Sequence, residues 1–193
     1  MWCKKCNRET EKKICEICGS VTEEDIPENI YWCENCNSPL IKKENSVDKL
    51  ICPECGGKLK YLTTDLRPVF PEERLLIEIL FDEQMKYHKD SVWASTNRYY
   101  INGKVVTVSS KNYKKYSSDY ILNELKKYKT ENNYIYFDKH IEKFVKLNRG
   151  RLNYLYDEAC NFIKDTQKKF PIENIIVSFS GGKDSTVTTF PFI

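Results

Sequence analysis

Eight of the nine cysteines form four Cys-x-x-Cys pairs within the first 55 residues. Two thiolates three positions apart can reach one ion across a tight turn, and four thiolates complete the tetrahedral shell of a structural zinc site. Gly19 and Gly56 each follow the second cysteine of a pair, where such a turn needs an unhindered backbone. The spacing therefore predicts two structural zinc ions, with these ligands: Cys3, Cys6, Cys15, Cys18, Cys33, Cys36, Cys52 and Cys55.

The four pairs can be combined into two sites in more than one way. Combining neighbours encloses eight residues between Cys6 and Cys15, and fifteen between Cys36 and Cys52. This tandem arrangement has shorter loops and a smaller closure entropy than an interleaved one, which stays open. Because four protein ligands leave no free coordination position, the expected role is structural, and a catalytic or iron-sulfur role is the alternative.

A second motif lies near the end of the sequence, where the run NIIVSFS at 174–180 continues into GGKDST. The run is β-branched and aromatic with little alternation, which is typical of a strand buried on both faces of a parallel sheet. A Walker P-loop is excluded, because Val177 stands where that motif needs glycine and Asp184 where it needs Ser or Thr. The remaining pattern is an anion cradle, in which glycines expose backbone amides and a helix N-terminus adds positive charge.

The stretch VSFSGGKDSTV resembles the PP-loop of the ATP pyrophosphatases, and most closely the phosphoadenosine phosphosulfate reductase family. The resemblance covers about residues 150–187 and, more loosely, the cysteine pairs. It implies a doubly wound α/β domain that binds ATP or 3′-phosphoadenylyl sulfate at the ends of its parallel strands. The phosphate-binding turn would then consist of Ser180, Gly181, Gly182, Lys183, Asp184, Ser185 and Thr186. The resemblance assigns no catalytic residue.

The residues after this turn depart from the family's pattern. A long amphipathic helix should follow Val187, but the sequence reads TTFPFI, in which Pro191 stops a helix early. We therefore expect an incomplete, truncated PP-loop domain, through a premature stop, a frameshift or the choice of expressed segment. We also expect this chain alone to turn over neither ATP nor phosphoadenylyl sulfate.

Between the cysteines and the turn, the pattern predicts helices and one hairpin. Pro68 and Pro71 keep the chain extended before Glu72 and Glu73 open a helix. Asn102-Gly103 is a type I′ hairpin turn. Helices follow with Ser118 or Asp119 as a cap and from about Asp138 to Lys169, with Gly150 as a candidate break. The predicted fold class is α+β and multi-domain. The expected divisions are zinc ribbon 1 (1–28), zinc ribbon 2 (29–62), a small α+β module with the β-hairpin (63–117), a helical connector (118–170) and the start of the PP-loop α/β domain (171–193).

Charge supplies a second functional hypothesis. Residues 111–170 carry fourteen basic and eight acidic side chains, a net charge of +6, with tyrosines interleaved. Cationic and aromatic side chains together suit nucleic acid, so the alternative to the reductase-like enzyme is a zinc-ribbon RNA-binding module of a PP-loop enzyme that thiolates tRNA. The tyrosines concerned are Tyr113, Tyr116, Tyr120, Tyr128, Tyr134 and Tyr136.

The remaining features point to a cytoplasmic protein. No apolar run reaches the roughly 18 residues of a membrane span, and the first residues lack the apolar core of a signal peptide. Reduced cysteine pairs fit that compartment. His88 and His140 are expected at the surface, and Cys160 is expected as a small buried hydrophobic residue. The sequence does not indicate an oligomeric state.

Overall fold

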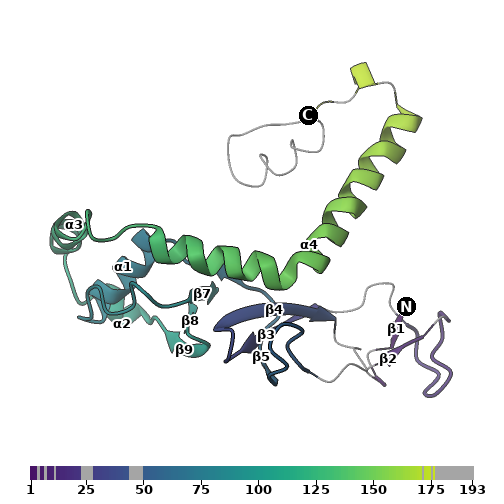
Figure 1. The fold of residues 1–193 in the computed structure, drawn as a ribbon, viewed down its shortest axis with the longest axis horizontal. Helices are drawn as coiled ribbons and strands as arrows, with labels where there is room; N and C mark the ends of the chain where they lie inside the picture. Colours follow the sequence, from purple (N-terminus) through teal and green to yellow (C-terminus); the bar gives the residue numbers. More distant parts are fainter. Residues whose placement is uncertain are drawn as a thin grey trace. The chain divides into compact units, whose positions relative to one another are not determined.

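The computed structural model describes residues 1–3, 5–6, 8–10, 12–22, 28–43, 50–170, 172–174 and 176. The chain divides into two compact units, Met1–Leu147 and Asn148–Ile193. The described residues have a mixed α+β fold with antiparallel sheets and four α-helices (Figure 1). The boundary between the units falls inside the segment 118–170, which was expected to be one helical connector.

The first cysteine-rich segment is small and held by few backbone contacts. Strands β1 (Trp2–Cys3) and β2 (Arg8–Glu9) pair antiparallel, and an isolated bridge joins Ile14 to Val21. Ile14, Ile17 and Val21 are 59%, 66% and 80% exposed, so the described side chains of this segment form almost no apolar core. Its fold must depend on what the cysteines bind.

The second cysteine-rich segment builds a three-stranded sheet in the order β4-β3-β5. Its strands are β3 (Glu28–Cys33), β4 (Ser38–Lys43) and β5 (Leu59–Thr63), and both neighbours run antiparallel to β3. Tyr31, Leu40 and Leu59 are buried together with three of the cysteines, and Leu147 packs on this cluster. This segment therefore has an apolar core that the first one lacks.

A four-stranded antiparallel sheet follows, in the order β6-β7-β8-β9. It comprises β6 (Arg67–Pro68), β7 (Val92–Ser95), β8 (Arg98–Ile101) and β9 (Lys104–Thr107). The turn between β8 and β9 is Asn102-Gly103, with φ of 48° and 76°. Both values are positive, as a type I′ turn requires, so the predicted hairpin is confirmed.

The helices also follow the predicted pattern with small shifts. Helix α1 (Pro71–Leu80) has the predicted acidic first turn but begins at Pro71, which was expected to precede it in the extended chain. Ser117, one residue earlier than expected, caps α3 (Ser118–Lys127) by accepting a hydrogen bond from the Tyr120 amide at 3.3 Å. Helix α4 (Ile135–Lys169) is helical through Gly150, and the boundary between the two units falls within it at Leu147 and Asn148, close to that candidate break. The short elements are α2 (Ser110–Tyr113) and the 3-10 turn η1 (Ile172–Asn174).

A second apolar cluster joins the two sheets and the first half of α4. Trp32 of β3, Trp93 of β7 and Tyr100 of β8 are buried together, with Ile141 and Phe144 of α4 packed against them. The Trp93 and Phe144 ring centroids are 4.9 Å apart. Buried aromatic side chains contribute a large share of core stability. The three-stranded sheet, the four-stranded sheet and the first half of α4 therefore form one packed body.

Two contacts at the β8–β9 turn reinforce this packing. The Asn37 side-chain amide donates to the Asn102 side-chain oxygen at 2.8 Å. Gly103 lies so close to the Trp32 ring that an added Cβ would be 2.5 Å from it. The turn is therefore fitted directly onto the second cysteine-rich segment.

The second unit begins with the later part of α4, which exposes much of its apolar stripe. Leu155, Tyr156 and Phe162 are 39%, 50% and 73% exposed. Cys160 is half-buried, so its expected full burial is not found. The predicted strand at 174–180 lies outside the described residues, apart from Asn174 at the end of η1 and Ile176. A search of the described residues finds no helix with the length and apolar composition of a membrane span.

Candidate metal centres

The first centre contains the sulfur atoms of Cys3, Cys6, Cys15 and Cys18, all within 4.8 Å of one another. The Cys3 and Cys18 sulfurs are 3.4 Å apart, and the Cys6 and Cys15 sulfurs 3.8 Å. Neither distance is a disulfide bond, which would be close to 2 Å. The four thiols face a common centre, and the cysteines of the two neighbouring pairs are combined.

The second centre repeats this geometry with Cys33, Cys36, Cys52 and Cys55. Its sulfur separations are 3.4 Å for Cys33 and Cys55 and 3.7 Å for Cys36 and Cys52. Three of its cysteines are buried, and Cys55 is exposed. The arrangement is again tandem, so the interleaved alternative does not occur.

Tight turns at the second cysteines bring each pair of sulfurs together. Gly19 and Gly56 both have φ of 68°, and their amides donate to the carbonyls of Cys15 and Cys52 at 2.9 Å. Asn37, with φ of 49°, occupies the matching place after Cys36. Glycine and asparagine adopt this left-handed conformation at low cost. The prediction that these turns need an unhindered backbone is therefore confirmed at Gly19 and Gly56.

Backbone amides also point at the sulfur atoms. The Cys6 amide donates to the Cys3 sulfur and the Cys36 amide to the Cys33 sulfur, both at 3.4 Å. Amide donors stabilise a thiolate over a thiol, which favours the form that binds metal. These hydrogen bonds lower the pKa of Cys3 and Cys33, but burial and the neighbouring thiols raise it by more, so the pKa of both is above its usual value.

The thiols of each centre differ in acidity. Hydrogen bonds from Ser20 lower the pKa of Cys18 to about 6, and the Gly57 amide lowers the pKa of Cys55 to about 7. In contrast, the hydrogen bond with Cys18 and burial raise the pKa of Cys6 to about 12, and burial raises that of Cys36. Because the pKa of Cys6 and of Cys36 is raised, a cation that binds all four sulfurs of a centre must displace protons.

The geometry fits a single tetrahedral ion. A zinc–sulfur bond of about 2.3 Å places tetrahedral sulfurs about 3.8 Å apart, close to the observed separations. A four-iron cluster inserts several atoms between its thiolates and needs a wider spacing than 4.8 Å allows. Both centres are therefore positioned to bind one metal ion each, and the sulfur-only ligand sets are consistent with zinc.

The predicted phosphate-binding turn lies outside the described residues. Its residues are Ser180, Gly181, Gly182, Lys183, Asp184, Ser185 and Thr186. Their assignment stays a prediction.

A buried ion pair on α1 was not predicted from the sequence. Arg74 and Glu78 are 6% and 0% exposed, and the Arg74 Nε lies 3.6 Å from the Glu78 carboxylate. Glu78 accepts hydrogen bonds from the amides of Met85 and Tyr87 at 3.0 and 2.6 Å, and burial raises its pKa. The spacing of four residues was visible in the sequence, but it occurs equally on exposed helix faces. The pair anchors the loop that follows α1.

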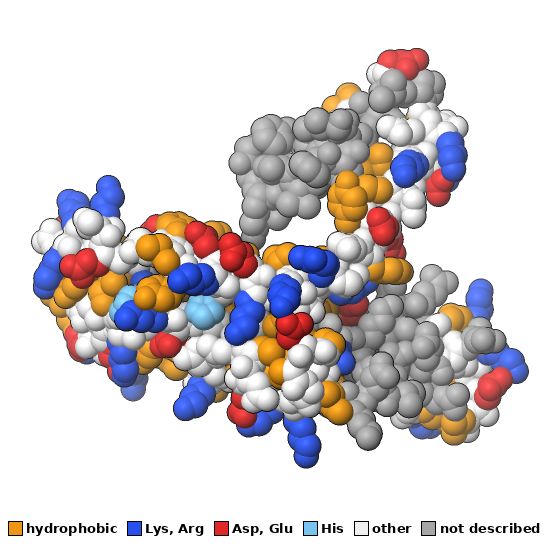
Figure 2. Space-filling model, viewed as in Figure 1, with side chains coloured by type: hydrophobic (Ala, Val, Ile, Leu, Met, Phe, Trp, Pro, Cys, Tyr) orange, Lys and Arg blue, Asp and Glu red, His pale blue; other side chains and the backbone are white. Residues whose placement is uncertain are grey.

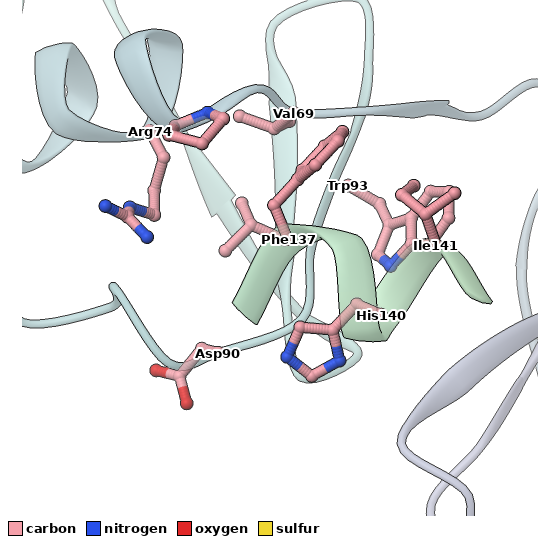
Figure 3. A pocket seen from close by; sticks show the side chains of 9 residues that line it. Val69, Arg74, Asp90, Trp93, Phe137, His140 and Ile141 are labelled. Atoms are coloured by element: carbon pink, nitrogen blue, oxygen red, sulfur yellow. The ribbon is translucent and has the colours of Figure 1, made fainter. Parts of the chain in front are cut away.

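Beside this pair lies a cavity of about 20 Å³, with room for about one water molecule. Figure 3 shows the Arg74, Asp90 and His140 side chains at one side of it and Phe137, Trp93 and Ile141 at the other. The space is too small for a substrate or cofactor. The cavity is therefore a small packing gap where α4 lies on the sheet, and we assign it no ligand.

The two histidines are more constrained than the sequence indicated. Both are half-buried, and each ring is hydrogen-bonded to a carbonyl: His88 to Met85 at 2.5 Å and His140 to Lys89 at 3.0 Å. The expectation that they are surface residues is therefore only partly met. Neither belongs to a metal-binding group within the described part of the chain.

Comparisons with known proteins add no identification. No family model, curated protein or solved structure matches the chain.

Proposed function

We propose that residues 1–170 form a zinc-stabilised part that precedes the nucleotide-binding turn of a PP-loop enzyme resembling the phosphoadenosine phosphosulfate reductase family. The motif SGGKDST at 180–186 is the observation that carries this proposal. The two four-cysteine centres support it, because they give the part ahead of the motif a metal-dependent fold. We further propose zinc in both centres and a cytoplasmic location, where thiolates stay reduced.

In this proposal the turn binds the phosphates of ATP or of 3′-phosphoadenylyl sulfate. Gly181 and Gly182 let backbone amides approach an anion, and Lys183 supplies a positive charge. Ser180, Ser185 and Thr186 add hydroxyl donors. The zinc ions take no part in the reaction, because four thiolates fill each coordination shell.

The test uses the protein expressed from its native gene, with its intact mass measured first. Equilibrium binding of ATP and of 3′-phosphoadenylyl sulfate is compared among the wild type, Lys183→Ala and, as control, Lys164→Ala on α4. We expect Lys183→Ala to weaken binding at least tenfold, because a charge-assisted contact to phosphate is lost. The proposal fails if the native protein binds neither nucleotide, or if Lys183→Ala binds as tightly as the control.

The surface of the first unit favours a second candidate, an RNA-binding module of a tRNA-thiolating PP-loop enzyme. Lysine ammonium groups lie 5.0–5.8 Å from tyrosine ring centres at several places, including Lys115 with Tyr116 and Lys127 with Tyr128. Cations beside aromatic rings suit phosphates and stacked bases. Salt-dependent binding of transfer RNA would support this candidate, and its absence at low salt would exclude it.

A further inference from the structure

One aromatic ring of the first unit lies among several cationic and imidazole side chains. Tyr136, in the first turn of α4, has the Lys89 and Lys139 ammonium groups 5.8 and 5.4 Å from its ring centre. The His88 ring meets it edge to face at 5.9 Å. Residues from the loop after α1 and from α4 thus converge on one ring.

The cationic character continues along α4. Lys139, Lys143 and Lys146 have the spacing i, i+4, i+7, which places them on one side of the helix over about 10 Å. Figure 2 shows Lys and Arg side chains along this part of α4, with the two histidines nearby. We call Lys89, Tyr136, Lys139, Lys143 and Lys146 the Tyr136 surface.

Most of these charges are available to a ligand. Lys89, Lys139 and Lys143 are exposed, and among the described residues no acidic side chain forms an ion pair with them. Lys146 differs, since its ammonium lies 2.5 Å from Glu54 of the second cysteine-rich segment. Three ammonium groups that have no acidic partner among the described residues therefore lie beside the ring or follow it along α4.

The backbone beneath the surface is firmly held. Arg74 donates to the His88 carbonyl at 2.8 Å, and His140 contacts the Lys89 carbonyl at 3.0 Å. The Asn102 side chain donates to Asp90 at 2.9 Å, which ties the loop after α1 to the hairpin turn. A ligand would thus meet a preformed backbone and would need to order only the lysine side chains.

We propose that the Tyr136 surface binds single-stranded RNA, with an unpaired base stacked on Tyr136 and the flanking phosphates on Lys89, Lys139 and Lys143. This rests on the second candidate function and names its binding surface. On binding, the Lys89 and Lys139 ammonium groups would leave the Tyr136 ring and contact phosphates instead. A ring among cations favours an unpaired base over a duplex, whose bases are already stacked on one another.

The first test measures how binding depends on salt. Fluorescence anisotropy of a labelled 20-nucleotide single-stranded RNA is recorded with the full chain between about 50 and 200 mM salt. Each phosphate contact contributes about −0.7 to the slope of log K against log salt. We expect Lys139→Gln with Lys143→Gln to reduce the magnitude of the slope by about 1.4. The matched control, Lys126→Gln with Lys129→Gln near the end of α3, should leave it unchanged.

The second test isolates stacking. Tyr136→Ala should weaken binding at least fivefold, as expected for one lost base–aromatic stack of about 1 kcal/mol or more. Tyr136→Phe keeps the ring and should bind like the wild type. Tyr156→Ala, which removes an exposed tyrosine of the second unit, should have no effect. Zinc content and circular dichroism show whether each variant is folded.

Three results would overturn the proposal. Absence of single-strand binding at low salt would exclude both the surface and the RNA-binding function. Equal affinity for a duplex of the same length would show phosphate attraction without stacking. Single-strand binding that survives Tyr136→Ala and the Lys139, Lys143 pair would exclude this surface alone and leave the second candidate function standing.

Discussion

At the scale of residues, Glu73 shows how one side chain can join three elements. Its carboxylate receives two hydrogen bonds of 2.6 Å from Arg67 at β6 and one of 2.9 Å from the Tyr99 hydroxyl of β8. The Arg67 hydrogen bonds lower the pKa of Glu73 below its usual 4.5. The start of α1 is thereby attached to the edge and the middle of the four-stranded sheet.

This depressed pKa predicts a pH dependence of stability. The stabilisation by ionised Glu73 is complete above its unfolded pKa of about 4.5 and is lost as the pH falls through the lower folded value. Glu73→Gln should cost about 1 kcal/mol at pH 7, and its stability should fall less steeply below pH 4.5 than that of the wild type. Urea unfolding at several pH values measures this. The same decrease of the unfolding free energy with falling pH in both proteins would contradict this prediction. The control is Glu142→Gln, at an exposed position of α4.

Gly103 offers a second prediction at this scale. Its φ of 76° and the closeness of Trp32 leave no room for a Cβ. Gly103→Ala should therefore destabilise the protein by about 2 kcal/mol or more, through backbone strain and displacement of the ring. Gly150→Ala is the matched control, because α4 has open space there and should gain up to about 1 kcal/mol. Similar unfolding midpoints for the two variants would refute this explanation.

At the scale of elements, the sequence predicted what local chemistry determines. The Cys-x-x-Cys pairs, the acidic first turn of α1 and the Asn102-Gly103 turn each impose their structure within a few residues, and all were identified. The junction of the two sheets was not predicted. It depends on Trp32, Trp93 and Phe144, which are distant in sequence and have no shared periodicity.

The same limit applies to the candidate site. The eight cysteines could be assigned as ligands because their spacing alone brings them together. The half-burial of His88 and His140, the contact of His88 with Tyr136 and that of His140 with Lys89 required the loop after α1 to fold back onto α4. The phosphate-binding turn stays a prediction from sequence.

The junction predicts that the second metal centre stabilises the hairpin. Cys33, Cys36 and Cys52 share a core with Tyr31, and the adjacent Trp32 packs on Trp93 and Tyr100. Cys52→Ser should therefore lower the hydrogen-exchange protection of amides in β8 and β9 at least tenfold. Cys15→Ser, in the first centre, should leave that protection intact. Unchanged protection in a Cys52→Ser protein that has lost its metal would contradict the coupling.

At the scale of the whole molecule, the chain combines two segments that are each positioned to bind a metal ion with a larger apolar body. The first segment exposes Ile14, Ile17 and Val21 and has almost no core, whereas the second shares its core with α4. Removing both metals with a chelator should therefore unfold the first segment completely. The four-stranded sheet should keep part of its structure through α1 and the core around Leu80 and Tyr99.

The metal content of the purified full chain tests the central claim most directly. Native mass spectrometry, with elemental analysis of the same sample, should find two zinc ions per chain. Cys15→Ser and Cys52→Ser should each retain one ion, because each removes a ligand from one centre only. A wild-type chain that binds fewer than two ions, carries an iron–sulfur cluster or holds these cysteines as disulfides would contradict the account.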